Sequence, residues 1–187
     1  MNWIVTNKDL LAVLIAAASL VVSIIAVIRT NRTASLTAKL QRSNILSELH
    51  DKICPGRQAM ESIWTQWSPS TNKDVESLSP SDEEQFIDFY NAEYHKSSDE
   101  RNKDLSNRIH VYLDELHSVW DRIERKEFDL EEVMRKLGDG IFLDRPFIRI
   151  YLKAHWKAEG QLEKSEKDRF WNNVSKIVDA AESWKNI

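Results

Sequence analysis

The sequence is poor in the residues on which several protein classes depend. Its 187 residues include one cysteine, four glycines and four prolines. The single cysteine, Cys54, excludes an internal disulfide framework and is typical of a reducing compartment. So few glycines argue against loops that cradle phosphate groups, and neither a P-loop nor a G-x-G-x-x-G pattern occurs.

The chain also has no large excess of charge of one sign. Its formal net charge is -4, and basic and acidic residues are evenly mixed. This balance argues against a dedicated nucleic-acid-binding protein. The sequence contains no internal repeat and no low-complexity tract. We therefore expect no nucleic-acid partner, and no cofactor is indicated.

What the sequence does have is one long apolar run near its start. No residue between Asp9 and Arg29 is charged, and Ser19 and Ser23 are the only polar ones. Both hydroxyls can bond to the carbonyl one turn earlier. The run forms about 28 Å of helix, which matches a bilayer hydrocarbon core of about 30 Å. We predict a transmembrane helix over residues 9–29.

Two other interpretations of the run are weaker. A soluble core helix of this length normally has a polar face, which this run lacks. A cleaved signal peptide requires a basic start, a shorter apolar stretch and a small-residue cleavage site. Ala16-Ala17-Ala18 resembles such a site, but the apolar run continues to Ile28, so cleavage would fall within the membrane. A retained anchor is the prediction.

The flanking charges predict how the span is oriented. Only Lys8 precedes the run, whereas four basic residues follow it closely, so the positive-inside rule places the C-terminal side in the cytoplasm. The predicted organisation is a short extracytoplasmic N-terminus (1–8), the transmembrane helix (9–29) and a cytosolic α-helical domain (30–187). The basic residues after the run, which are also candidates for lipid or partner contact, are Arg29, Arg32, Lys39 and Arg42.

One face of the predicted span is small. Small residues let two helices approach closely in lipid, so this face is a candidate for homodimerisation or for contact with a partner span. Because alanine and serine are ordinary residues in spans, the face also needs no special role. Its members recur at spacings of three and four: Ala12, Ala16, Ser19, Ser23 and Ala26.

The rest of the chain has helical periodicity, and no alternating pattern typical of a strand occurs. The predicted fold class is all-α, with one N-terminal transmembrane helix continuing into a soluble bundle of five to six helices. The span is expected to continue as helix to Cys54-Pro55-Gly56, where proline disfavours helix. A short helix then follows over residues 57–67.

Caps and stops predict the later helices. Expected helix starts are Ser81 (a capping box with Glu84), Asp129 and Asp144, and expected stops are Gly138 and Gly160. Pro146 is expected in the first turn after Asp144. The longest soluble helix is predicted over about 99–125 and the last over about 164–185, each with an apolar stripe.

Two stretches resemble a known group of small bacterial proteins. IRTNRTASLTAKLQRSNILSELHDK directly follows the apolar run, and FDLEEVMRKLGDGIFLDRPFIRIYLKAHWK follows the helix VYLDELHSVWDRIE. Their pattern and order are similar to an uncharacterised family of single-span membrane proteins with a C-terminal helical cytosolic domain of unknown function. The resemblance covers nearly the whole chain. It implies a bacterial inner-membrane protein and supplies no catalytic residues.

A polar stripe on the long helix is the only candidate catalytic feature. Its residues, at spacings of four, three and four, are His110, Asp114, His117 and Asp121. Imidazole and carboxylate groups are metal ligands and acid–base catalysts, and Asp114-x-x-His117 is similar to the motif of di-metal bundles. Those bundles need the motif twice, and no second copy occurs. A solvated helix flank is the simpler interpretation, and a metal-dependent hydrolase is the alternative.

A second candidate surface is a basic ridge, defined as Arg145, Arg149, Lys153 and Lys157. Its four-residue spacing would let it lie on anionic lipid headgroups or meet an acidic partner. Alternatively, the ridge is an exposed face paired with nearby acids. With no complete catalytic constellation in view, the sequence favours a membrane-anchored helical interaction or adaptor module, with an unidentified protein partner. Metal-dependent hydrolase and lipid-surface sensor are the alternatives.

Overall fold

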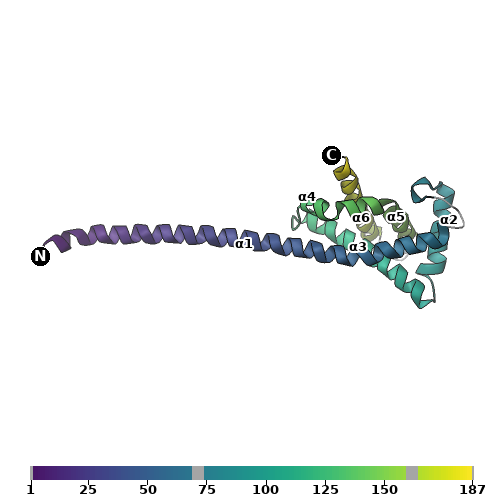
Figure 1. Ribbon diagram of the computed structural model, residues 1–187, viewed down its shortest axis with the longest axis horizontal. Coiled ribbons are helices and arrows are strands. Elements are labelled where there is room, and N and C mark those ends of the chain that lie inside the picture. Colours follow the sequence, from purple (N-terminus) through teal and green to yellow (C-terminus); the bar gives the residue numbers. More distant parts are fainter. Residues whose placement is uncertain (1, 69–73, 159–163, 187) are drawn as a thin grey trace. The chain divides into compact units, whose positions relative to one another are not determined.

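The computed structural model describes residues 2–68, 74–158 and 164–186. Nearly all of these residues are helical and no strand occurs among them, which confirms the all-α prediction (Figure 1). The chain divides into two compact units, Met1–Asn44 and Ile45–Ile187.

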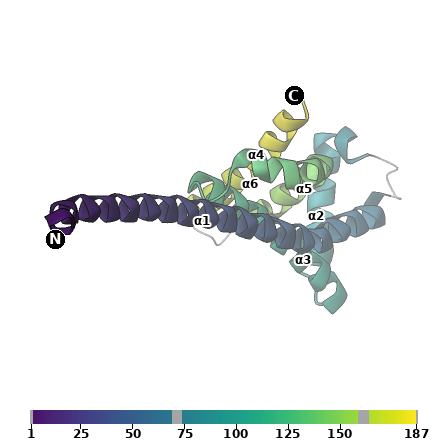
Figure 2. The same ribbon diagram turned by 60° about the vertical axis from the view of Figure 1, so that its left-hand side comes forward.

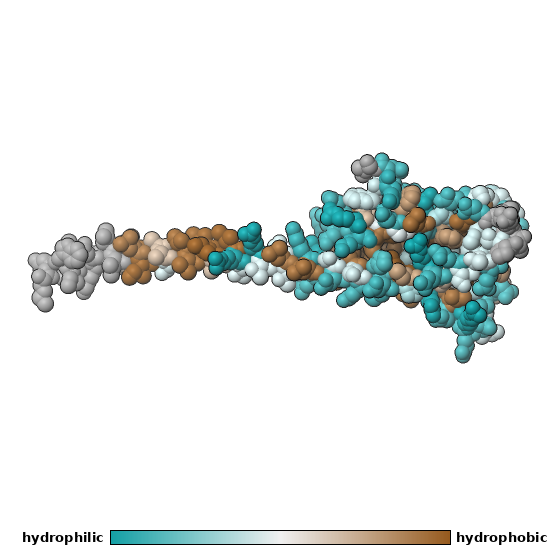
Figure 3. Space-filling view, viewed as in Figure 1, coloured by the Kyte–Doolittle hydropathy of each residue, from teal (hydrophilic) through white to brown (hydrophobic). Residues whose placement is uncertain are grey.

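The first unit consists of the N-terminal part of helix α1 (Asn2–Trp67). Its apolar side chains from Val13 to Ile28 are exposed, and Figure 3 shows the hydrophobic surface that they make. The Ser23 hydroxyl donates to the Ser19 carbonyl at 2.8 Å, as predicted. This stretch is long and apolar enough to cross a membrane, with a mean hydropathy of 2.5 and no part of it buried.

The predicted helix stop at Cys54-Pro55-Gly56 is wrong. Helix α1 continues through Pro55 to Trp67, so the expected separate helix over 57–67 is its last three turns. Proline inside a helix costs about 3 kcal/mol because it removes a hydrogen bond and crowds the preceding turn. Burial outweighs this cost, since Leu49 and Ile53 before the proline and Met60 and Ile63 after it pack into one core.

Gly56 has a packing role rather than a helix-ending one. A Cβ atom at this position would lie 2.4 Å from Cβ of Tyr112 and 2.7 Å from the carbonyl oxygen of Arg108. Both partners belong to α3 (Glu100–Glu124), so the glycine allows the two helices to touch backbone to backbone. No larger side chain fits there without moving α3.

Helix α2 (Pro80–Tyr90) begins earlier than predicted. Its cap is Ser79 rather than Ser81: the Ser79 hydroxyl accepts from the Asp82 amide, and the Asp82 carboxylate accepts from the Ser79 amide. Pro80 occupies the first helical position, where a missing N–H costs nothing. A single π-helical turn, η3 (Asn91–His95), continues α2 and buries Tyr94.

Helix α3 matches its predicted range closely. Asp99 caps it by accepting from the amides of Arg101 and Asn102. The predicted apolar stripe is buried at Ile109, Leu113 and Leu116. After the helix ends, Lys126 adopts a φ of 61°, a left-handed conformation that glycine usually supplies at this position.

The predicted break at Gly138 is also wrong. Asp129 caps α4 (Leu130–Val133) as expected, but a π-helical turn, η4 (Met134–Gly138), leads directly into α5 (Asp139–Ala158). No described glycine has a positive φ, so Gly138 does not form a helix-ending turn. The extra residue of a π-turn shifts the helix register, and Met134, Leu137 and Ile141 are all buried as a result.

The predicted cap Asp144 lies inside α5 instead, with Pro146 in the same helix. Its carboxylate pairs with Arg57 of α1 at 2.9 Å and accepts a hydrogen bond from the Tyr112 hydroxyl of α3 at 3.1 Å. Asp144 therefore joins three helices of the second unit through one buried charge. The expected stop at Gly160 lies outside the described residues, as does part of the loop before η2 (Val75–Ser77).

The last helix, α6 (Lys164–Lys185), packs on α3 and α5, and Figure 2 shows the same elements from a second side. Its predicted apolar stripe is buried at Val174, Ile177 and Ala181. Aromatic rings fill another part of the core between α1, α2 and α5. Among them, Phe86 has its ring centroid 5.3 Å from those of Trp64 and Tyr151.

Candidate functional site

The polar stripe predicted on α3 divides among different environments. At its C-terminal end, Asp121 binds Arg169, Arg125 and Asn173. Desolvation opposes ionisation of this carboxyl, but these contacts together lower its pKa. Because cationic and amide donors surround the carboxylate, Asp121 does not offer free lone pairs to a metal ion.

In the middle of the stripe lie Asp114 and His117. The imidazole of His117 packs against Phe170 of α6, with ring centroids 5.2 Å apart. Burial lowers the pKa of His117, although Asp121 and Asp114 oppose the effect. Its Nδ1 atom is buried and has no hydrogen-bond partner in the structure. His117 is therefore neutral at pH 7, whereas Asp114 is exposed.

The N-terminal end of the stripe contacts histidines that the sequence analysis did not single out. His110 Nε2 lies 3.2 Å from Nδ1 of His155 on α5. The ring centroid of His95, which belongs to η3, lies 5.3 Å from the ring centroid of His110. The structure thus does not bring the four stripe residues to one point, and among the residues it describes no three His, Cys, Asp or Glu side chains are placed to hold a metal ion.

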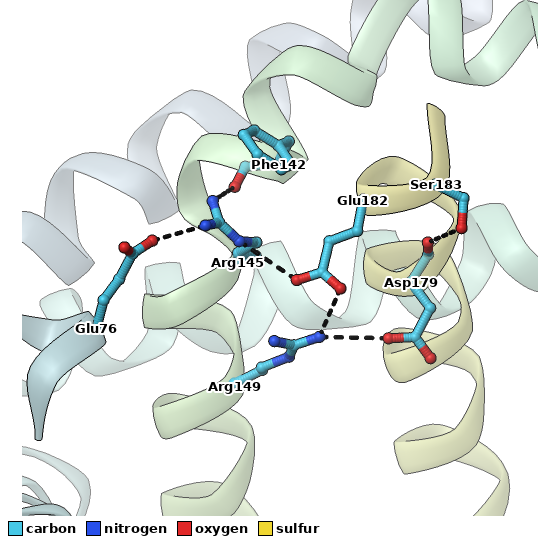
Figure 4. A network of polar contacts seen from close by, with 7 residues as sticks. All are labelled: Glu76, Phe142, Arg145, Arg149, Asp179, Glu182 and Ser183. Carbon is cyan, nitrogen blue, oxygen red and sulfur yellow. Dashed lines mark hydrogen bonds and ion pairs between the residues drawn. The ribbon is translucent and has the colours of Figure 1, made fainter. Parts of the chain in front are cut away.

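The basic ridge lies along α5, and each of its four side chains has an acidic partner from another element. Arg145 pairs with Glu76 of η2 at 2.7 Å and with Glu182 of α6 at 3.3 Å. Arg149 reaches Glu182 at 3.0 Å and Asp179 at 3.4 Å (Figure 4). The Arg145 guanidinium also lies over the Phe142 ring, 4.1 Å from its centroid.

The remaining two ridge residues pair with α2. Lys153 contacts Glu83, and Lys157 lies 2.9 Å from Asp88, whose hydrogen bond raises the pKa of the lysine. The ridge is therefore neutralised within the second unit rather than presented as a free cationic surface. This arrangement matches the interpretation of an exposed face paired with nearby acids, and it weighs against docking on lipid headgroups.

A groove of about 620 Å³ lies beside the ridge, between α5 and α6. Its apolar wall includes Leu152, Trp171, Val174 and Val178, and the ion pairs of Figure 4 form its rim. The volume falls within the range of ligand sites, which is about 300–1,000 Å³, and an apolar wall with a polar rim is their usual lining. This groove is the candidate contact site of the second unit.

The other predicted surfaces belong to the first unit. All five residues of the small face are exposed there. So are Arg29, Arg32 and Lys39, whereas Arg42 is half-buried. Unlike the ridge, these exposed basic side chains follow directly on the apolar stretch.

Comparison with known proteins adds no relative. No protein-family model matches the chain, and neither a curated protein nor a solved structure matches it. The fold defines the class: an all-helical protein whose first helix is apolar and long enough to cross a membrane. The resemblance to single-span bacterial proteins stays a prediction.

Proposed function

We propose that this protein is a membrane-anchored interaction or adaptor module, with its helical second unit in the bacterial cytoplasm. One observation carries the anchor: the apolar stretch of α1 is wholly exposed, with Val22 at 66% and Ile28 at 59%. A core helix of a soluble protein would bury such residues. Within a bilayer the same side chains face acyl chains, and all helix backbone bonds are satisfied.

A cleaved leader is the competing explanation of this stretch. Cleavage after Ala18 would leave Leu20, Val21 and the apolar residues up to Ile28 exposed on a soluble protein. The same helix also extends into the core of the second unit at Leu46 and Ile53. A retained span that keeps Arg29 and Arg32 on the cytoplasmic side of the inner membrane is more consistent with both facts.

The interaction role rests on the second unit. Its predicted catalytic stripe is divided, and the groove between α5 and α6 has an apolar wall with charged groups at the rim. A partner that places an apolar side chain against Trp171 and Val178 would bury surface that is now open to water. The anchor would raise the local concentration of this groove for partners at the same membrane.

Site-specific photocrosslinking of the full chain in native bacterial membranes tests the role of the groove. A benzoylphenylalanine in place of Ser175, which lines the groove, is expected to capture one partner. The matched control carries the same group at exposed Asn107 of α3, outside the groove. The proposal fails if Ser175 yields no adduct, or if both positions yield the same adducts.

Membrane extraction tests the anchor separately. Alkaline carbonate removes peripheral proteins from membranes but leaves spanning ones in the pellet, and we expect the full chain in the pellet. Ile15→Lys combined with Val22→Lys should release it, because each charge at the centre of a span costs about 3 kcal/mol on insertion scales. Release of the unaltered chain by carbonate would contradict the anchor.

The proposal includes self-association through the small face. Ser19→Cys, in a Cys54→Ser background, should form an intermolecular disulfide in oxidised membranes. The matched control is Val21→Cys, because two residues along a helix turn the side chain by about 200°. Equal disulfide yields at both positions would contradict a dimer built on this face.

A further inference from the structure

Four of the five histidines of this chain gather in one seam of the second unit. His95 comes from η3, His110 and His117 from α3, and His155 from α5. Phe170 of α6 lies between His117 and His155, with ring centroids 5.2 and 5.5 Å from theirs. The other three histidines contact one another directly.

We propose that His95, His110 and His155 form a binding site for a divalent late transition-metal ion such as Zn²⁺, Ni²⁺ or Cu²⁺. The site is separate from the groove and goes beyond the proposed interaction role. Neutral imidazole is a good ligand for all three ions, and a cluster without carboxylates disfavours Mg²⁺ and Ca²⁺. The three rings are partly exposed, so an ion can enter from solvent.

The closest pair already has the spacing of two ligands on one ion. His110 Nε2 and His155 Nδ1 are 3.2 Å apart. Two nitrogens bound to Zn²⁺ at about 2.1 Å with a near-tetrahedral angle lie about 3.4 Å apart. The two imidazoles now share a proton in a hydrogen bond. On metal binding this proton moves to the other nitrogen of its ring or leaves to solvent, so that both facing nitrogens offer lone pairs.

The ring of His95 lies at a distance that suits a third imidazole ligand on the same ion. The ring centroids of His110 and His155 are 4.6 Å apart, and that of His95 lies 5.3 and 6.4 Å from them. A circle through the three centroids has a radius of about 3.2 Å, which is also about the distance from a Zn²⁺ ion to the centre of a bound imidazole.

Ring rotation completes the site. Among the described residues, no three His, Cys, Asp or Glu side chains are placed to hold a metal ion as they stand, so at least one ring must turn about its side-chain bonds. The torsion next to a histidine ring is broad and roughly two-fold, and these rings are not sealed in the core. A bound ion would then fasten η3, α3 and α5 to one another, and stabilise the second unit by mass action.

Zinc titration of the purified full chain in detergent, with a tag that contains no histidine, tests the site. Calorimetry should show one Zn²⁺ per chain with micromolar or tighter affinity, and the melting temperature should rise and fall back after EDTA. His155→Gln and His95→Gln should each weaken binding by about tenfold or more, which corresponds to 1.4 kcal/mol. Helical circular dichroism without metal checks that the variants are folded.

Two matched controls use the remaining histidines. His50→Gln, in the exposed part of α1, and His117→Gln, on the far side of Phe170, should bind Zn²⁺ as the unaltered chain does. His110→Gln provides a second route if His155→Gln does not fold. The proposal is overturned if the unaltered chain takes up no stoichiometric Zn²⁺, or if folded His155→Gln or His110→Gln binds it with unchanged affinity.

Discussion

Asp144 gives the sharpest test of the energetics of this fold. Its side chain is 6% exposed and joins Arg57 and Tyr112 of two other helices. Burial raises the pKa of this carboxyl from 3.8 to about 6, against the opposing effects of Arg57 and the Tyr112 hydroxyl. At pH 7 the carboxyl is therefore ionised and paired with Arg57. Burying its charge costs desolvation free energy, which a neutral asparagine side chain would not incur.

The sign and size of the effect follow from linkage. Because the pKa is higher in the folded chain than in the unfolded one, the folded chain holds more protons between pH 3.8 and about 6. The contribution of Asp144 to stability is thus fully present below the unfolded pKa and is lost as the pH rises to about 6. Two pKa units correspond to about 3 kcal/mol.

The assay is urea unfolding of Asp144→Asn and of the unaltered chain, followed by helical circular dichroism in mild detergent. Asparagine resembles the protonated carboxyl, so both proteins should have similar free energies of unfolding near pH 4. At pH 7 the variant should be more stable by about 3 kcal/mol. A variant that is less stable at pH 7 would refute the reasoning, since it would mean that attraction to Arg57 outweighs desolvation.

Three further predictions concern local features. Gly56→Ala should lower the free energy of unfolding by about 1–3 kcal/mol despite alanine's better helix propensity, because its Cβ would overlap Tyr112; an unchanged urea midpoint would contradict this. Lys126→Gly should raise stability by about 1 kcal/mol in the same assay, by relieving a left-handed φ; a loss of stability would argue against that backbone conformation. A double-mutant cycle of Lys153→Ala and Glu83→Ala should give a coupling of about 0.5 kcal/mol that disappears in about 1 M salt; coupling that persists in salt would argue against a surface ion pair.

Local signals predicted where most helices lie but not all of their ends. The cap Asp129 was readable because an N-cap depends only on the next three residues. Pro55 and Gly138 were misread because the usual helix-stop rules take no account of burial. In this fold the buried residues on both sides of each signal keep the helix intact.

The candidate sites depend on how helices pair, which one sequence does not reveal. The predicted stripe correctly placed His110 and His117 on one helix, but their real neighbours, His155 and Phe170, lie 45 and 53 residues further along the chain. Even spacing within one helix identifies a face, whereas the partners of that face follow from tertiary packing. The acidic partners of the basic ridge were hidden for the same reason.

The packing of the last turns of α1 also gives the chain a built-in optical reporter. Trp64 and Trp67 are buried with ring centroids 5.1 Å apart and planes inclined by 50°. Two indoles this close couple their ultraviolet transitions, and their emission is shifted to short wavelength by the apolar surroundings. The coupling depends on α1 staying helical beyond Pro55, because both indoles belong to that helix. Loss of this excitonic signal would therefore report unwinding of the last turns of α1 without any added label.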